Sequence, residues 1–142
     1  MGTIHVTWVQ GKTFIGTDST NHSVVISAPA DGVGMKPSDL LLVALGSCTA
    51  YDVVNILEKK RAHITGVQVS AAGEQLPEAP WTFTKIHLHY VVTGAGLKPE
   101  DVAKAIELSE AKYCSVSATL KATVDITYDF EIQEAAAYAH QP

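Results

Sequence analysis

The sequence is poor in the residues that nucleic-acid-binding or disulfide-stapled proteins need. Lysine and arginine together number ten against fifteen aspartates and glutamates, which gives a net charge of −5 over 142 residues. Nucleic-acid binding needs a basic face, so this balance argues against nucleic acid as a partner. Two cysteines are too few for a disulfide framework, and in a cytosolic protein such cysteines are more often free or redox-active.

The sequence also shows no hydrophobic run of membrane-spanning length and no pattern typical of a targeting segment. The continuous apolar run from Leu40 to Leu45 is far too short for a membrane span, so we expect no membrane contact. Met1 leads directly into polar and strand-like residues; no secretory or transit segment is expected, and the cytoplasm is the expected location. The length predicts a single domain, 1–142, with enough residues for a real core.

The stretch Pro37–Arg61 has the pattern of one long central helix. Ser38 or Asp39 would cap its amino-terminal end, and three basic residues at its other end suit the helix dipole. Because its first turns offer no polar face, the helix should be buried on most sides. One chain of this size has few strands with which to cover such a helix, so we expect it to pack in a homodimer.

Alternating apolar residues predict strands on both sides of this helix. Three strands are expected before it, at Ile4–Val9, Thr13–Thr17 and His22–Ala28, the first of them half-buried. The elements expected after it are two strands, a helix, a short helix and a last strand with an acidic, solvated face, at 64–75, 82–93, 99–113, 115–120 and 123–132. This order predicts an α+β fold with antiparallel sheets and helices on one side.

The two cysteines carry the chemistry that the sequence suggests. Cys48 lies inside the central helix among small residues, which leave room for a reagent to approach. Cys114 lies at a helix exit, where amide groups of a following helix could stabilise an anion. If the two sulfurs meet, one thiolate can attack an O–O bond and become a sulfenic acid, which the other thiol converts to a disulfide. Packing of Cys48 as a small buried hydrophobe is the alternative.

Two segments carry a resemblance to a known family. Residues 37–54 and 112–117 read PSDLLLVALGSCTAYDVV and KYCSVS. They resemble the two cysteine motifs of the OsmC/Ohr family, the osmotically inducible protein C and organic hydroperoxide resistance proteins, and the OsmC-like branch in particular. The resemblance covers nearly the whole chain. It implies an OsmC-like fold, with antiparallel sheets around a long central helix, in an intertwined homodimer with two sites at the subunit interface.

The resemblance also implies a function in the oxidative stress response, the thiol-dependent reduction of organic hydroperoxides. By the matching motifs, Cys48 is the peroxidatic cysteine and Cys114 is the resolving cysteine that forms a disulfide with it. No metal or prosthetic group is implied. An external dithiol, of the lipoyl type in better-known members, would recycle the oxidised protein.

Three charged residues are candidates to support the reactive thiolate. Sites of this family resemble one another in an arginine beside the cysteine, held by a glutamate near the start of the central helix. Lys12 lies roughly where that arginine falls, and Asp39 lies one position after that of the glutamate, where Ser38 stands. Arg61 is the chain's single arginine, about 20 Å from Cys48 along a straight helix, so it could serve only the cysteine of a partner chain.

Two other functions remain open. Asp52 lies one helical turn after Cys48, and a carboxylate on the same face disfavours a thiolate. This favours an OsmC-like dimer that binds a small hydrophobic ligand and has unreactive thiols. His87 and His89 share a strand face at a spacing that can bind metal, but metal sites usually need further ligands. A solvated sheet face is the preferred interpretation of the two histidines, and no metal site is predicted.

Overall fold

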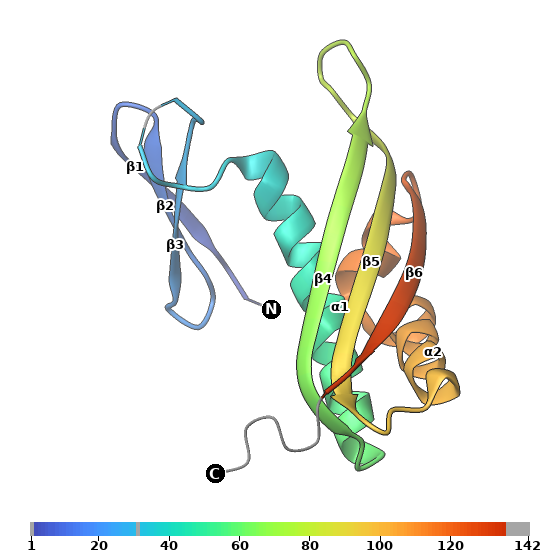
Figure 1. Cartoon of the computed structure of the whole chain (residues 1–142). Coiled ribbons are helices and arrows are strands. Elements are labelled where there is room, and N and C mark those ends of the chain that lie inside the picture. The colour runs from blue at the N-terminus through green and yellow to red at the C-terminus, as the bar shows by residue number, and fades with distance from the viewer. Residues whose placement is uncertain (1, 31, 136–142) are drawn as a thin grey trace. The chain divides into compact units, whose positions relative to one another are not determined.

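The structure, a computed structural model, describes residues 2–30 and 32–135. Its contacts divide the chain into two compact units, an amino-terminal unit that ends at Leu41 and a carboxy-terminal unit that begins at Leu42. The elements follow in the order β1 (His5–Gln10), β2 (Thr13–Thr17), β3 (Ser23–Ser27), α1 (Pro37–Lys59), β4 (His63–Gln75), β5 (Phe83–Ala95), α2 (Pro99–Leu108), η1 (Ser109–Tyr113), α3 (Ser115–Leu120) and β6 (Asp125–Glu134) (Figure 1). The predicted α+β class is confirmed, and the single domain stays a prediction.

The amino-terminal unit contains an antiparallel sheet in the order β1-β2-β3. The three predicted strands are all present, and Gly11 supplies the positive φ of 50° at the turn between the first two. The prediction of a half-buried first strand is wrong, because every residue of β1 is exposed, including Val6 and Trp8. A single three-stranded layer has no second layer to cover its apolar side chains.

The carboxy-terminal unit contains a sheet in the order β4-β5-β6. β4 and β5 form a long antiparallel hairpin, whereas β5 and β6 are parallel. The prediction of antiparallel pairing is therefore wrong for this last pair. A parallel neighbour needs a crossover connection, and the helical segment from Pro99 to Leu120 provides it.

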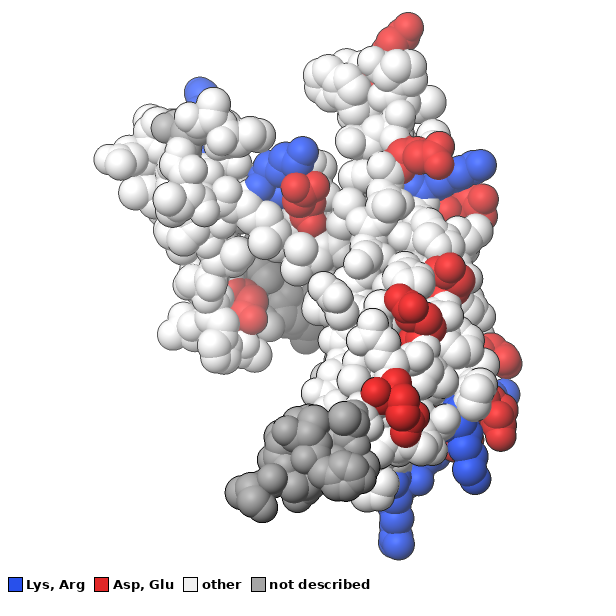
Figure 2. Space-filling model, viewed as in Figure 1, with Lys and Arg blue, Asp and Glu red and all other residues white. Residues whose placement is uncertain are grey.

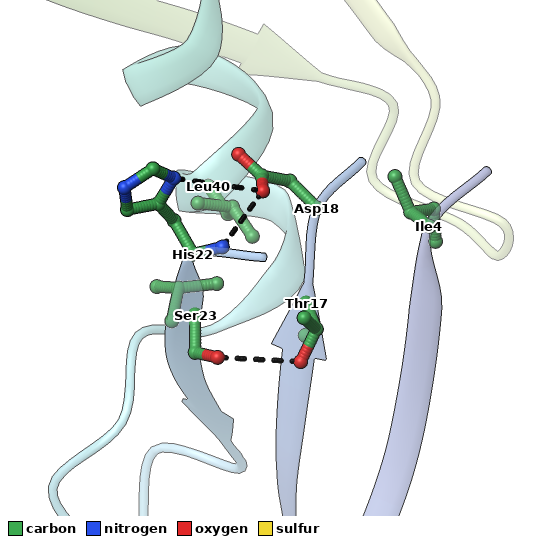
Figure 3. Close-up of a pocket in the computed structure, with 8 residues that line it drawn as sticks. Ile4, Thr17, Asp18, His22, Ser23 and Leu40 are labelled. Carbon is green, nitrogen blue, oxygen red and sulfur yellow. Dashed lines mark hydrogen bonds and ion pairs between the residues drawn. The ribbon is translucent and has the colours of Figure 1, made fainter. Parts of the chain in front are cut away.

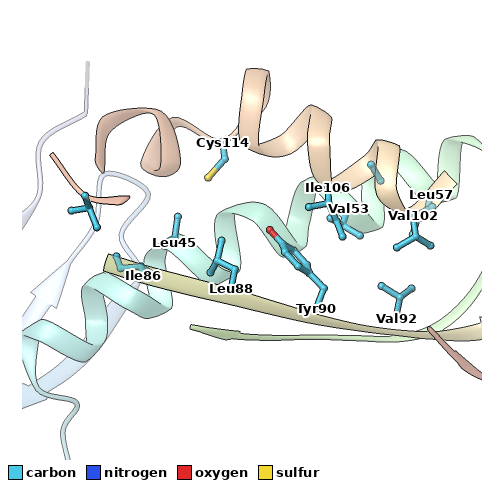
Figure 4. Close-up of a cluster of buried hydrophobic side chains, with 12 residues drawn as sticks. Leu45, Val53, Leu57, Ile86, Leu88, Tyr90, Val92, Val102, Ile106 and Cys114 are labelled. Carbon is cyan, nitrogen blue, oxygen red and sulfur yellow. The ribbon is translucent and has the colours of Figure 1, made fainter. Parts of the chain in front are cut away.

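The core of this unit lies between the sheet and the helices. Side chains of α1 and α2 meet the apolar face of β5, in one cluster that includes Leu45, Leu57, Leu88 and Ile106 (Figure 4). The face predicted to be apolar on β5 is buried as expected. Burial of a large aliphatic side chain stabilises a fold by about 1.5–3 kcal/mol, so this cluster dominates the folding energy of the unit.

The helix α1 is covered on one face only within this chain. Its buried residues recur every one to four positions, at Leu45, Gly46, Thr49, Val53 and Leu57. The prediction that the helix is buried on most sides is therefore wrong for a single chain. The predicted caps are also wrong, since the helix starts at Pro37 and both Ser38 and Asp39 lie inside its first turn.

Among the described residues, one helix has the length and composition of a membrane span, and it is α1. Its apolar window has a mean hydropathy of 1.8, and 22% of that window is buried inside the structure. The core helix of a water-soluble protein meets the same test, so this match is weak evidence for a span. Because α1 packs its buried face on β5 and α2, we interpret it as a core helix.

The segment after α2 differs from the uniform helix that the sequence predicts. Pro99 opens α2 as expected, but the chain widens into the π-helical turn η1, in which the amide of Cys114 donates to the carbonyl of Ser109 at 2.9 Å. A uniform helix over 99–113 would place Tyr113 on the same inward face as Ser109, one turn earlier, but Ser109 is buried whereas Tyr113 is 53% exposed. The extra residue in the wide turn rotates Tyr113 out of this face. The short helix predicted next is present as α3.

Candidate active site

The structure brings the two cysteines of the sequence together within the carboxy-terminal unit. Cys48 on α1 is half-buried, Cys114 before α3 is 2% exposed, and both are free thiols. Cys48 lies close enough to Cys114 to act on it: burial, and after it the neighbouring Cys48 side chain, raises the pKa of Cys114. The arrangement therefore allows attack of either sulfur on the other.

Burial dominates the electrostatics of Cys114. It raises the pKa of this thiol to about 12, and the Cys48 hydrogen bond acts in the same direction. The backbone amide of Ser117, in the first turn of α3, donates to the Cys114 sulfur at 3.3 Å and lowers the pKa in part. The expected amide contact is present, but burial outweighs it, so Cys114 keeps its proton at neutral pH.

A chain of buried hydroxyl groups runs beside the two thiols. The Thr49 and Tyr90 hydroxyl oxygens lie 2.7 Å apart, and the Ser109 hydroxyl lies 2.9 Å from the Thr49 oxygen. The Ser109 hydroxyl is also within 2.8 Å of an Asp52 carboxylate oxygen. The carboxylate of Asp52, which the sequence places one turn after Cys48, thus has a hydrogen-bond partner on η1.

Glu110 is the functional candidate that sequence reasoning missed. The Tyr90 hydroxyl donates to one oxygen of its carboxylate at 3.2 Å, and the Ser117 hydroxyl donates to the other at 2.6 Å. Burial, offset in part by the hydrogen bond to Thr49, raises the pKa of Tyr90 far above its usual range, so Tyr90 acts only as a neutral hydroxyl. Figure 4 shows Cys114 and Tyr90 at the same buried cluster. The one signal in the sequence is the spacing of Glu110 four residues before Cys114.

The three predicted supporting residues are divided between the two units of the chain. Lys12, in the turn after β1, and Asp39, whose carboxylate lies 3.9 Å from the Lys36 ammonium group, belong to the amino-terminal unit. Arg61 follows the end of α1, about three helical turns beyond Cys48, as its position in the sequence requires. Support of the thiolate by any of them stays a prediction.

A groove of about 470 Å³ lies along the carboxy-terminal unit, and its lining includes sequence neighbours of the thiols but neither thiol itself. It is lined by residues of α1 and of the α2–η1 segment, namely Asp52, Asn55, Ile56, Lys59, Lys60, Leu108 and Tyr113. Asp52 is one turn from Cys48, and Tyr113 directly precedes Cys114. The groove thus combines an apolar floor with two ammonium groups at the far end of α1.

A second cavity, of about 330 Å³, lies inside the amino-terminal unit (Figure 3). Its lining includes Ile4, Leu40 and the turn from Asp18 to His22, where the Asp18 carboxylate accepts the backbone amide of His22 at 2.9 Å. Neither thiol lines it. We therefore place the candidate chemistry in the carboxy-terminal unit.

The two histidines of β5 interact with the parallel strand β6. His87 and His89 both contact one carboxylate oxygen of Asp129, at 2.9 and 2.7 Å, and His89 also contacts Glu131 at 3.3 Å. The hydrogen bonds to Asp129 and Glu131 raise the pKa of His89, and the bond to His89, followed by that to His87, lowers the pKa of Asp129. Among the described residues, no group of three or more His, Cys, Asp or Glu side chains is arranged to hold a metal ion.

The visible face of the molecule carries charges of both signs. Figure 2 shows acidic and basic side chains on the described part of this face, some of them side by side and others separated by uncharged areas. The acidic residues of β6 are more than solubilising charges, because two of them pair with the histidines of β5.

Comparisons with known proteins agree with one another. A family profile described as "OsmC-like protein" matches residues 30–129. Protein YhfA of Escherichia coli K12 is 40% identical over 127 residues, which are 89% of this chain and 95% of YhfA. A hypothetical protein of Aquifex aeolicus VF5 is 26% identical with a TM-score of 0.86, over 96% of this chain and 98% of its own. The organic hydroperoxide resistance protein OhrB of Bacillus subtilis is 14% identical with a TM-score of 0.61, over 92% of this chain and 98% of its own.

Proposed function

Because the chain belongs to the OsmC family, we propose that it is a cytoplasmic, thiol-dependent peroxidase that reduces organic hydroperoxides. The observation that carries the proposal is the contact between Cys48 and Cys114, two thiols far apart in the sequence. The name of the structurally similar OhrB, an organic hydroperoxide resistance protein, supports the same chemistry. Cys48 is assigned as the peroxidatic cysteine because it is the more exposed of the two.

In the first step the Cys48 thiolate attacks the terminal oxygen of the hydroperoxide. A sulfur–oxygen bond forms as the O–O bond breaks, so the sulfur is oxidised to a sulfenic acid. The departing alkoxide takes up a proton and leaves as an alcohol. The half-buried position of Cys48 allows a small substrate to reach it, and the neighbouring groove of about 470 Å³ can hold an organic group.

In the second step the Cys114 sulfur attacks the oxidised Cys48 sulfur. An S–S bond forms as the S–O bond breaks, and the Cys114 proton leaves with the hydroxyl group as water. Burial and the neighbouring Cys48 raise the pKa of Cys114, so Cys114 still carries its proton when it approaches the oxidised sulfur. An external dithiol, such as a lipoyl group, would then supply the two electrons and two protons that restore both thiols.

The experiment that tests this function treats the reduced protein with one equivalent of cumene hydroperoxide. We expect loss of both free thiols and a Cys48–Cys114 disulfide, detected by mass spectrometry of the digested protein. Cys114→Ser should instead stop at a Cys48 sulfenic acid that dimedone traps. Cys48→Ser should lose reactivity with the peroxide, and a Cys48→Ser protein that reduces peroxide as fast as the parent would overturn the proposal.

A second candidate function is the binding of a small hydrophobic ligand with unreactive thiols. The observation that favours it is the Asp52 carboxylate, which lies one turn from Cys48 and also lines the groove. The two functions separate in one measurement, the rate of Cys48 alkylation by iodoacetamide in the Cys114→Ser protein. Alkylation as slow as that of free cysteine, together with no peroxide reduction, would favour the binding function.

A further inference from the structure

One half-buried carboxylate beside the thiols has no part in the two steps above. Glu110 occupies the π-helical turn η1, and its carboxylate accepts hydrogen bonds from Tyr90 on β5 and Ser117 on α3. These donors come from separate elements, so they fix both oxygens of the carboxylate in place. A carboxylate fixed inside a protein acts on its neighbours more strongly than one that moves in solvent.

Ser117 connects this carboxylate directly to Cys114. Its hydroxyl donates to Glu110 at 2.6 Å, while its backbone amide donates to the Cys114 sulfur at 3.3 Å. The negative charge and the sulfur therefore lie on two sides of the same residue. Among the described residues, no hydrogen-bonded residue joins Cys48 to the Glu110 carboxylate in this way, so the arrangement is asymmetric between the two thiols.

The Glu110 carboxylate is not neutralised by a cation in the described part of the chain. None of the ion pairs among residues 2–30 and 32–135 includes it. The nearest recorded cation, Lys121, donates to the backbone carbonyl of Glu110 at 2.9 Å and not to its carboxylate. A negative charge that is not neutralised opposes the formation of a second negative charge nearby.

We propose that Glu110 is a positioning residue that keeps the proton on Cys114 and thereby makes Cys48 the nucleophile of the pair. The inference rests on the proposed function. It adds an explanation of why Cys48 is the nucleophilic cysteine and Cys114 the resolving one. With its proton retained, Cys114 can donate to a thiolate at its neighbour Cys48 and so stabilise negative charge there. The same proton is then available to leave with the hydroxyl group when the disulfide forms.

The other titratable groups near Cys114 do not provide this asymmetry. Tyr90 stays neutral, and its hydroxyl is shared between Thr49 and Glu110. Asp52 projects from the helix that carries Cys48, and its carboxylate lies against the Ser109 hydroxyl. Glu110 is thus the group whose charge acts on Cys114, and Ser117 contacts both of them.

The test uses the two-cysteine composition of the chain, since Cys48→Ser leaves Cys114 as its single thiol. The rate of iodoacetamide alkylation is measured against pH in Cys48→Ser with and without Glu110→Gln. Removal of the charge should shift the profile of Cys114 to lower pH and raise its alkylation rate at pH 8 roughly tenfold, the effect of about one pKa unit. The matched control is Glu107→Gln, an exposed glutamate on α2 that pairs with Lys104, and it should leave the profile unchanged.

A second variant separates charge from loosened packing. Tyr90→Phe removes one hydrogen bond to the carboxylate but keeps its charge, so it should not raise the reactivity of Cys114. Equal gains in Tyr90→Phe and Glu110→Gln would show that exposure, not charge, controls the thiol, and would overturn the inference. An unchanged profile in a Glu110→Gln protein with the parent melting temperature would also overturn it.

In the protein with both cysteines, the position of a dimedone label shows which cysteine reacts with the peroxide. After one equivalent of cumene hydroperoxide with dimedone present, the label that escapes disulfide formation should lie on Cys48 in the parent, and an increased share of it should lie on Cys114 in Glu110→Gln. Absence of both the label and the Cys48–Cys114 disulfide in the parent would overturn the proposed peroxidase function. The alkylation profile of Cys114 would still decide the role of Glu110, so the two failures are distinguishable.

Discussion

At the scale of single residues, Thr49 shows how the buried polar groups beside the thiols are satisfied. Its hydroxyl lies between those of Tyr90 and Ser109, each of which also reaches a carboxylate. Among the described residues, no buried side-chain nitrogen or oxygen lacks a hydrogen-bond partner. If the Thr49 hydroxyl is lost, Tyr90 and Ser109 each keep a carboxylate as a hydrogen-bond partner. If the Ser109 hydroxyl is lost, the Asp52 carboxylate loses the hydrogen bond from it.

We predict that Thr49→Val, which keeps the shape of the side chain, costs about 1 kcal/mol of unfolding free energy. Ser109→Ala should cost more, about 1–3 kcal/mol, because it removes the hydroxyl that lies against Asp52. Urea denaturation followed by circular dichroism measures both. A larger loss for Thr49→Val than for Ser109→Ala would contradict this account of the network.

The paired charges of β5 and β6 give a second prediction at this scale. Asp129→Asn should lower the pKa of His89 towards its ordinary value near 6.5, because the hydrogen bond to Asp129 is the largest cause of its rise. Titration of the histidine ring signals by NMR measures the shift. His5, outside this cluster, serves as the internal control, and an unmoved His89 would contradict the assignment.

The same pair sets the pH range in which it supports the fold. The raised pKa of His89 gives a contribution to stability that is complete below a pH of about 6.5. This contribution is lost as the pH rises through the pKa that His89 has in the folded protein. The lowered pKa of Asp129 gives a second contribution to stability, which is present above a pH of about 3.9. This contribution is lost as the pH falls through the pKa that Asp129 has in the folded protein. The pair thus supports folding most between these limits, and only weakly because both groups are solvent-screened.

The sequence predicts the candidate residues only where a motif carries them. Cys48 and Cys114 could be singled out by their type and their motifs, but no spacing shows that their sulfurs meet. Glu110 could not be found in this way, because its partners Tyr90 and Ser117 belong to elements that only the tertiary fold brings together. A charged residue on a helix is normally solvated, so its burial is not visible in the pattern.

At the scale of elements, local periodicity predicts most helices and strands because each pattern is repeated within its own segment. The predictions fail where the structure of a segment depends on a distant part of the chain or on an irregular turn. The parallel partner of β5 depends on the crossover through α2 and α3, which alternation within β6 does not encode. The π-helical turn rotates Tyr113 outward, and helical spacing alone assumes a regular turn.

Two glycines near the end of β5 give a prediction about this hairpin. A side-chain carbon at Gly94 would overlap the backbone oxygen of His63 on β4, whereas one at Gly96 would meet open space at a φ of +63°. We expect Gly94→Ala to lower the unfolding free energy by more than 2 kcal/mol, since backbone atoms must move. Gly96→Ala should cost only about 1 kcal/mol, from the strained φ. Thermal melting compares the two, and equal losses would contradict the close approach of β4 and β5.

At the scale of the whole molecule, large apolar side chains remain exposed within one chain. Those on α1 include Val43, 47% exposed, and Tyr51, 70% exposed, and β1 exposes further ones. Exposed apolar patches on this scale mark an interaction surface. They support the homodimer that the family resemblance implies, because a second copy would cover the face of α1 that this chain leaves open.

We predict that Tyr51→Glu or Val43→Lys weakens this dimer, because each places a charge in an apolar contact. The parent should sediment as a dimer in analytical ultracentrifugation, and the variants should shift towards the monomer by at least tenfold in dissociation constant. Glu100→Lys, a charge change at an exposed position on α2, is the control. A parent that is monomeric at all concentrations would contradict the dimer.

The contact between Cys48 and Cys114 has a consequence for the unfolded chain as well as for catalysis. Joining the two sulfurs would close a loop of roughly 65 residues, which holds the β4–β5 hairpin and α2. By the chain-entropy relation, a loop of this length restricts the denatured ensemble enough to stabilise the folded state by about 4 kcal/mol. Oxidation of the two sulfurs to a disulfide would then raise the melting temperature of the whole carboxy-terminal unit.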